Sequence, residues 1–146
     1  MKQIIKGKDP LNDKGAFIKQ PAKRKRILLC IPVELHSCID EIRYKEGITL
    51  RSLVGKTLTP FISKDEITHE PSTALQLCSI KADRTVDATV ILSEDEHGTL
   101  RAINHYWKVS YSAFLVDALI KLLVREYGET YPDTPGMDIL KKAIKL

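Results

Sequence analysis

The sequence predicts a mainly α-helical protein with a small amount of β-structure, built from two copies of a strand–helix–helix unit. Three observations predict this fold class. Two short apolar runs have the composition of β-strands, and each is followed by two segments whose apolar residues recur every three or four positions. The second copy superimposes on the first without a gap after a shift of 61 residues, which indicates an internal duplication.

The first unit covers residues 25–62. Lys25–Ile31 is a β-rich apolar run, and Pro32 ends the strand and suits the first turn of a helix. The helix that follows has one apolar side, and Gly47 is a suitable residue for its C-terminal stop. The apolar residues of this helix are Leu35, Cys38, Ile39 and Ile42.

A second helix is expected to start after Thr49, whose hydroxyl suits an N-cap. Two residues weaken this helix. Gly55 costs about 1 kcal/mol relative to alanine in a helix interior, and Pro60 removes a hydrogen bond or kinks the last turn. The apolar stripe of the second helix consists of Leu53, Val54, Thr57, Leu58 and Phe61.

The second unit covers residues 85–127. Thr85–Leu92 reads as a strand, and Ser93 with the acidic residues after it is a helix-start signal. Tyr106–Val109 is expected to form the turn, with Tyr106 or Trp107 packed at the corner between the helices, and Ser110 opens the last helix. The apolar side of that helix is formed by Phe114, Leu115, Ala118, Leu119, Leu122 and Leu123.

Residues 1–24 are predicted to be a basic flexible arm. Together with Lys25 and Arg26, the arm holds nine Lys or Arg residues against two Asp residues, a charge of +7, although the whole chain carries only +4. A basic arm ahead of a mildly acidic body is common in proteins that contact nucleic acid, because flexible cations neutralise phosphates and release counterions. A merely solubilising tail is the alternative.

Two further segments complete the chain. Residues 63–84 are expected to be a linker with a short helical or extended piece around 74–80. Residues 128–146 are expected to be a loop and a short helix from Met137, which either docks on the protein's own core or binds a separate protein. Its apolar side would consist of Ile139, Leu140, Ala143 and Ile144.

No pattern of catalytic or metal-binding residues stands out. The cysteines Cys30, Cys38 and Cys78 lack a Cys-x-x-Cys spacing, which favours reduced, buried thiols. The four histidines lack metal-ligand spacing with cysteine, and there is no glycine-rich phosphate loop or nucleophile elbow. The sequence therefore predicts a protein without enzymatic activity, metal or cofactor. Without a long apolar run, the expected location is the cytoplasm, with no membrane partner.

One strand–helix–helix unit is too small to be stable alone and leaves its strand edges unpaired. It needs a partner that carries the same unpaired edge. The sequence from Arg26 to Leu35 with its Pro-x-Glu-Leu junction, followed by Ile39, Ile42 and the turn Gly47-Ile-Thr-Leu-Arg-Ser, resembles the ribbon-helix-helix proteins, the superfamily of the Arc and MetJ repressors.

The resemblance implies that the two strands pair as a short antiparallel β-ribbon, that four helices pack beneath it, and that the ribbon enters the major groove of double-stranded DNA. Two units in one chain then form an intramolecular pseudo-dimer, with a homodimer of exchanged units as the alternative. The expected function is that of a transcriptional regulator or an accessory of plasmid DNA processing in conjugation.

The resemblance also implies roles for individual residues. Strand residues Ile27, Leu29, Ile31, Ala88, Val90 and Leu92 would point toward the helices. The base-facing residues would be Arg26, Leu28, Cys30, Asp87, Thr89 and Ile91. Phosphate contacts would come from Lys23, Arg24, Lys25, Thr49, Arg51, Ser110 and Ser112.

The base-facing set departs from the family pattern, because family members usually present polar side chains there. Only Arg26, Asp87 and Thr89 can hydrogen-bond to bases, whereas Leu28 and Ile91 can contact thymine methyl groups at most. A run that is apolar on both faces is typical of a strand covered on both sides. The alternative function is therefore a protein interaction module whose partner binds the apolar ribbon face or the C-terminal helix.

Overall fold

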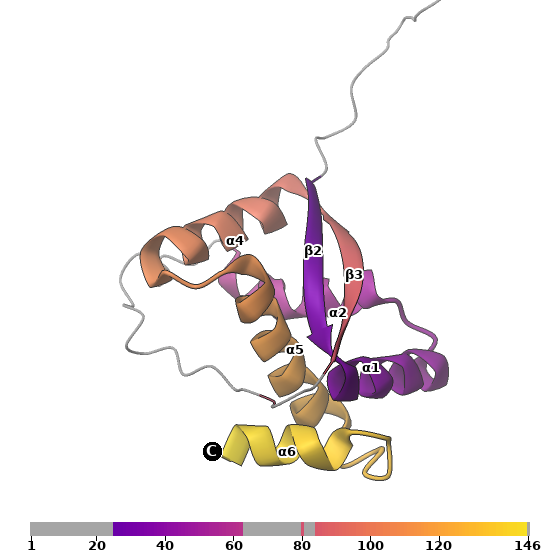
Figure 1. Cartoon of the computed structure of the whole chain (residues 1–146). Coiled ribbons are helices and arrows are strands. Elements are labelled where there is room, and N and C mark those ends of the chain that lie inside the picture. The colour runs from indigo at the N-terminus through magenta and orange to yellow at the C-terminus, as the bar shows by residue number, and fades with distance from the viewer. Residues whose placement is uncertain (1–24, 63–79, 81–83, 146) are drawn as a thin grey trace, which may run out of the picture.

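The computed structural model describes residues 25–62, 80 and 84–145. The fold is mainly helical with one two-stranded antiparallel sheet (Figure 1). In chain order the elements are β2 (Lys25–Pro32), α1 (Val33–Glu46), α2 (Leu50–Leu58), the 3-10 helix η1 (Thr59–Phe61), β3 (Thr85–Leu92), α4 (Glu94–Trp107), α5 (Tyr111–Tyr127) and α6 (Met137–Lys145). The expected arm and nearly all of the linker lie outside the described residues.

The two strands pair with each other along their whole length, and Lys25 lies opposite Leu92 while Pro32 lies opposite Thr85. Because β2 and β3 run in opposite directions, α1 leaves one end of the ribbon and α4 leaves the other (Figure 1). The helices lie on one side of the ribbon, and burial alternates accordingly along both strands. The buried strand residues are Ile27, Leu29, Ile31, Val90 and Leu92, each of which stabilises the fold by roughly 1.5–3 kcal/mol.

The first strand–helix–helix unit has the junctions that its sequence predicts. Pro32 immediately precedes α1, and Gly47 ends it in the left-handed conformation with a φ of 66°. The Thr49 hydroxyl caps α2 by accepting a hydrogen bond from the Ser52 backbone N–H at 3.0 Å. The α-helix stops at Leu58, and the chain continues as the 3-10 turn that contains Pro60.

The second unit repeats these junctions. Ser93 and Glu96 form a complete capping box at the start of α4, and Ser110 caps α5 by accepting from the Ala113 backbone N–H at 3.1 Å. The left-handed residue between the helices is Lys108, with a φ of 58°. The predicted turn at Tyr106–Val109 starts too early, because α4 continues to Trp107.

The 61-residue shift that relates the two units in the sequence also relates their helices in the structure. α4 begins and ends 61 positions after α1, and α5 begins 61 positions after α2. The left-handed residues Gly47 and Lys108 and the caps Thr49 and Ser110 obey the same shift. Residues 61 positions apart are called equivalent below.

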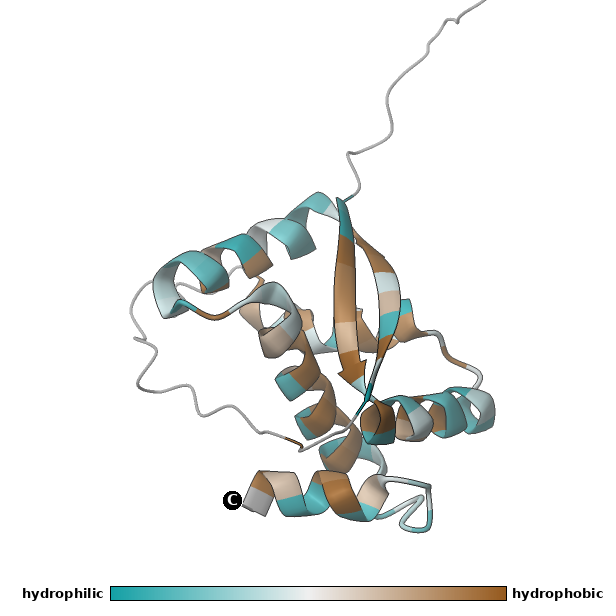
Figure 2. Cartoon of the chain, viewed as in Figure 1, coloured by the Kyte–Doolittle hydropathy of each residue, from teal (hydrophilic) through white to brown (hydrophobic). Residues whose placement is uncertain are grey.

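One hydrophobic core lies between the ribbon and the helices and includes buried apolar residues of both strands and of α5. Both the ribbon and α5 contain many hydrophobic residues (Figure 2). Burial raises the pKa of the Cys38 thiol to about 11, so this cysteine is a neutral core residue. The expectation of buried thiols is wrong for Cys30, which is exposed on the ribbon. Cys78 lies outside the described residues. At the helix corner, Phe61 makes edge-to-face contacts with both Trp107 and Phe114, whereas Tyr106 is exposed.

The C-terminal segment docks on the protein's own core. α6 packs against α5 and α1 with Met137, Leu140 and Ala143 buried. The predicted apolar side was wrong in part, because Ile139 and Ile144 are partly exposed. The sequence pattern could not show that α6 lies against two helices at once, which fixes the side of α6 that is covered.

Candidate nucleic-acid interface

Six side chains form the exposed face of the ribbon, on the side away from the helices. This outer ribbon face consists of Arg26, Leu28, Cys30, Asp87, Thr89 and Ile91, and all six residues are exposed. These are the six residues that the resemblance implied would face outward, and their exposure agrees with the rule that successive strand residues point to opposite faces. The large apolar side chains Leu28 and Ile91 are 55% and 39% exposed.

The register of the strands arranges these six residues in three cross-strand pairs. Arg26 lies opposite Ile91, Leu28 opposite Thr89, and Cys30 opposite Asp87. Leu28 and Thr89 are also 61 positions apart and therefore equivalent, so this pair lies at the centre of the relation between the two strands. The cation and the carboxylate therefore stand at diagonally opposite corners of the outer ribbon face.

The start of α5 lies beside β2, and the start of α2 lies near the end of β3, where Arg51 pairs with Glu96. α5 contacts β2, and α2 contacts β3. In the first turn of α5, the Ser112 hydroxyl accepts a hydrogen bond from the Cys30 backbone N–H at 3.0 Å. Each cap satisfies one of the four N–H groups that a helix start leaves without an intrahelical partner, so the first turns of both helices retain the partial positive charge that attracts anions.

Arg51, a predicted phosphate contact, is held by a carboxylate of the other repeat. Its guanidinium donates to both carboxylate oxygens of Glu96, with Nη2–Oε1 at 2.7 Å and Nη1–Oε2 at 3.0 Å. The pair lies close to Gly55 of α2, because a Cβ at that position would lie 3.1 Å from Arg51 Nη1 and 3.4 Å from Glu96 Oε2. Sequence analysis missed this pair, since nothing in the spacing of residues 45 positions apart predicts contact.

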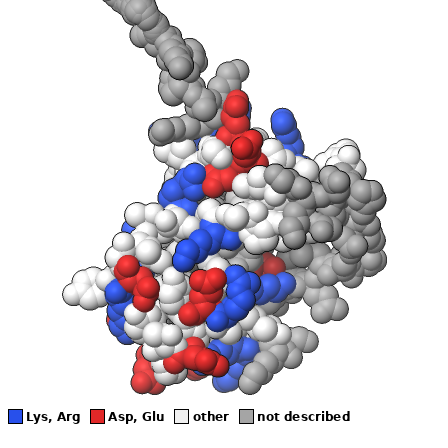
Figure 3. All heavy atoms as spheres, turned by 180° about the vertical axis from the view of Figure 1, so that it is seen from behind, with Lys and Arg blue, Asp and Glu red and all other residues white. Residues whose placement is uncertain are grey.

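The remaining predicted cations lie where β2 begins. Lys23 and Arg24 fall outside the described residues, and Lys25 is exposed opposite Leu92. Partial burial lowers the pKa of His97 on α4, and the charges of Lys25 and Arg101 lower it further. Seen from behind, the described surface carries mixed charges, with acidic side chains gathered near its top (Figure 3).

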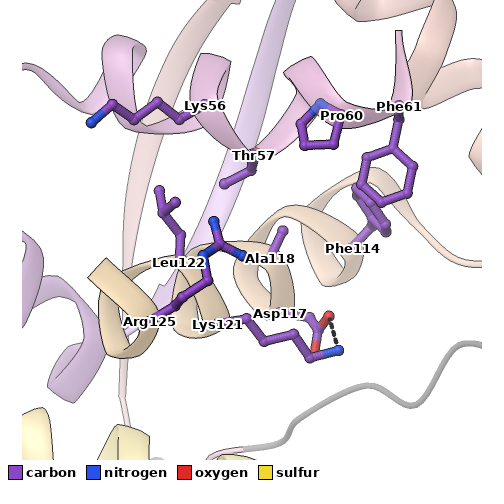
Figure 4. A pocket seen from close by; sticks show the side chains of 10 residues that line it. All are labelled: Lys56, Thr57, Pro60, Phe61, Phe114, Asp117, Ala118, Lys121, Leu122 and Arg125. Carbon is purple, nitrogen blue, oxygen red and sulfur yellow. Dashed lines mark ion pairs between the residues drawn. The ribbon is translucent and has the colours of Figure 1, made fainter. Parts of the chain in front are cut away.

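A separate hollow of about 240 Å³ lies between α2, η1 and α5 (Figure 4). Its walls include Phe61, Phe114 and Leu122. The charges at its rim belong to ion pairs, because Lys121 Nζ lies 3.1 Å from Asp117 Oδ2 and Lys56 Nζ lies 3.8 Å from Glu126 Oε1. Sequence analysis missed the buried Asp117, although the four-residue spacing of Asp117 and Lys121 inside an apolar helix was a usable signal.

Comparison with known proteins adds no assignment to this geometry. No protein-family model, no curated protein and no solved structure matches the chain significantly. Within the described residues, histidine, cysteine, aspartate and glutamate side chains form no group of three or more that could hold a metal ion. None of the described helices is both long and apolar enough to cross a membrane.

Proposed function

We propose that this chain is a ribbon-helix-helix pseudo-dimer that binds double-stranded DNA without catalysing a reaction, as a transcriptional regulator or an accessory of plasmid DNA processing. One observation carries the proposal: an exposed two-stranded ribbon has the start of α5 beside β2 and the start of the equivalent helix α2 near the end of β3. The major groove admits a two-stranded ribbon. The phosphates of the two DNA strands border that groove, so each helix start would meet one of them.

This arrangement gives the helix starts and the outer ribbon face different roles. The first turns of α2 and α5 would hold phosphates and fix the register, while the outer ribbon face would meet the base edges. The basic arm joins the ribbon at Lys25, from which it can reach further phosphates on the same duplex. The arm would supply affinity that does not depend on sequence.

Titration of a fluorescent duplex tests the role of the arm. Binding by the full chain should weaken steeply as salt rises, because each neutralised phosphate releases counterions. Removal of residues 1–24 should lower the affinity for all duplexes alike and reduce the salt dependence. Tight binding that ignores salt and survives removal of the arm would contradict this role.

A matched pair of substitutions tests the ribbon face. Leu28→Arg and Tyr44→Arg each replace an exposed apolar side chain by a cation, and Tyr44 lies on α1 with 87% of its surface exposed. Only Leu28→Arg should tighten duplex binding, because only Leu28 would face the groove. Equal tightening by both variants would show that the ribbon is not the DNA-binding face.

A second candidate function is capture of a protein through the outer ribbon face. The exposure of Leu28 and Ile91 favours it, because covering exposed apolar side chains with a partner lowers the free energy. The double variant Leu28→Arg, Cys30→Asn separates the two functions. It should abolish binding of a protein partner, and it should preserve or increase affinity for DNA.

A further inference from the structure

We infer that the DNA site of this protein is not palindromic, and that Arg26 and Asp87 read guanine and cytosine at its two ends. The inference rests on the proposed function. In a symmetric dimer, equivalent positions carry the same residue, so the operator mirrors the two-fold symmetry of the protein. Here one chain supplies both β-strands of the ribbon, and the two β-strands carry different side chains at equivalent positions.

All three equivalent pairs on the outer ribbon face differ in chemistry. Arg26 is equivalent to Asp87, Leu28 to Thr89, and Cys30 to Ile91. The register puts the Leu28–Thr89 pair at the centre and leaves Arg26 and Asp87 at opposite ends. A guanidinium that only donates hydrogen bonds therefore occupies one end, and a carboxylate that accepts them occupies the other.

These two groups require different base edges. Arginine donates two hydrogen bonds to the O6 and N7 atoms of guanine, and aspartate accepts one from the N4 amino group of cytosine. In a palindrome, the guanine read by Arg26 would be repeated beneath Asp87, where the carboxylate would face the two acceptors of guanine. Repulsion between acceptors disfavours that arrangement. If the G·C base pair at the Asp87 end is reversed, the amino group of cytosine lies beneath the carboxylate instead.

A sharper form of the inference concerns the two strands of the duplex. A palindrome carries G at one end and C at the other end of the same strand. The preferred site should carry G at both ends of one strand, because that order puts cytosine of the opposite strand beneath Asp87. At the centre, Leu28 contributes an apolar surface that suits the methyl group of thymine.

Selection from a random duplex library with the full chain tests the inference. The enriched site should lack two-fold symmetry. Titration should then show that the G…G duplex binds about tenfold or more tightly than its G…C palindrome. Asp87→Arg should reverse this preference, since arginine would then stand at both ends. Circular dichroism should show an unchanged fold, because position 87 is exposed.

Glu129→Arg is the matched control, because it makes the same change of charge at an exposed loop position. It should leave the preference between the two duplexes unchanged. An enriched palindrome, or a preference that Asp87→Arg does not alter, would overturn the inference and leave DNA binding standing. Failure of the unmodified chain to bind any duplex would overturn the proposed function as well.

Discussion

Glu96 takes part in two contacts, one inside its own strand–helix–helix unit and one that joins the two units. Its Oε1 accepts a hydrogen bond from the Ser93 backbone N–H at 2.9 Å, which completes the capping box of α4. The same carboxylate holds the Arg51 guanidinium at the start of α2. Position 35, the equivalent of Glu96, is the buried Leu35, so only one edge of the ribbon has this contact. A carboxylate beside a helix N-terminus competes with a phosphate for the same site.

Glu96→Gln is expected to increase affinity for duplex DNA several-fold at low salt. Glutamine can still accept from Ser93, as capping boxes use either residue, but it no longer neutralises Arg51. Fluorescence anisotropy at several salt concentrations measures the effect. Glu129→Gln removes the same charge from an exposed loop and should change affinity much less. Equal gains from both variants would mean that only net charge matters.

At the scale of elements, the sequence predicted the strands and most helix boundaries because their signals are local. Proline at the end of β2, hydroxyl caps at Thr49 and Ser110 and glycine at position 47 each act through the backbone of their own turn. Lys108 gave no such signal, because lysine rarely adopts a positive φ. The structure holds it there through its place between two packed helices, where Asn104 Nδ2 also donates to the Val109 carbonyl at 2.9 Å.

Substitutions at the two equivalent turns should have opposite effects on stability. Gly47→Ala should lower the free energy of unfolding by about 1 kcal/mol. A φ of 66° is strained for any residue with a Cβ, even though no atom would lie within 4 Å of a Cβ at this position. Lys108→Gly should relieve the same strain and stabilise the fold by up to about 1 kcal/mol, less the entropy that glycine adds to the unfolded chain. Urea unfolding measures both changes.

Gly98→Ala provides the control for backbone strain. Gly98 lies inside α4 with open space around it, so alanine should stabilise this helix by roughly 0.5–1 kcal/mol. Destabilisation by Lys108→Gly, or no loss from Gly47→Ala, would contradict the role assigned to the left-handed turns.

At the scale of the whole molecule, the sequence predicted which strand residues face the helices but not how distant segments meet. The outer ribbon face is the set that the resemblance implied, and the alternating burial along the strands agrees with it. The Arg51–Glu96 pair and the covered side of α6 depend on contacts between elements far apart in the chain. One such contact is close: a Cβ at Gly136 would lie 2.5 Å from the Glu34 carbonyl oxygen of α1. The turn before α6 therefore passes directly against α1 and sets the orientation of α6.

Leu140→Ala should destabilise the whole fold by about 2–4 kcal/mol, because it empties part of the core beneath α6. Ile139→Ala, one position away and 37% exposed, should cost less than about 1 kcal/mol. Chemical denaturation followed by circular dichroism and tryptophan fluorescence measures both. If α6 were only loosely attached, the two substitutions would have similarly small effects.

The pairing of β2 with β3 inside one chain affects how the sequence of the ribbon can evolve. In a ribbon made by two identical chains, every mutation alters both ends at once, and the amount of folded protein falls with dilution. In this chain a mutation at position 26 leaves position 87 as it was. Each end of the ribbon can therefore be selected separately, and a single translated molecule carries the whole surface.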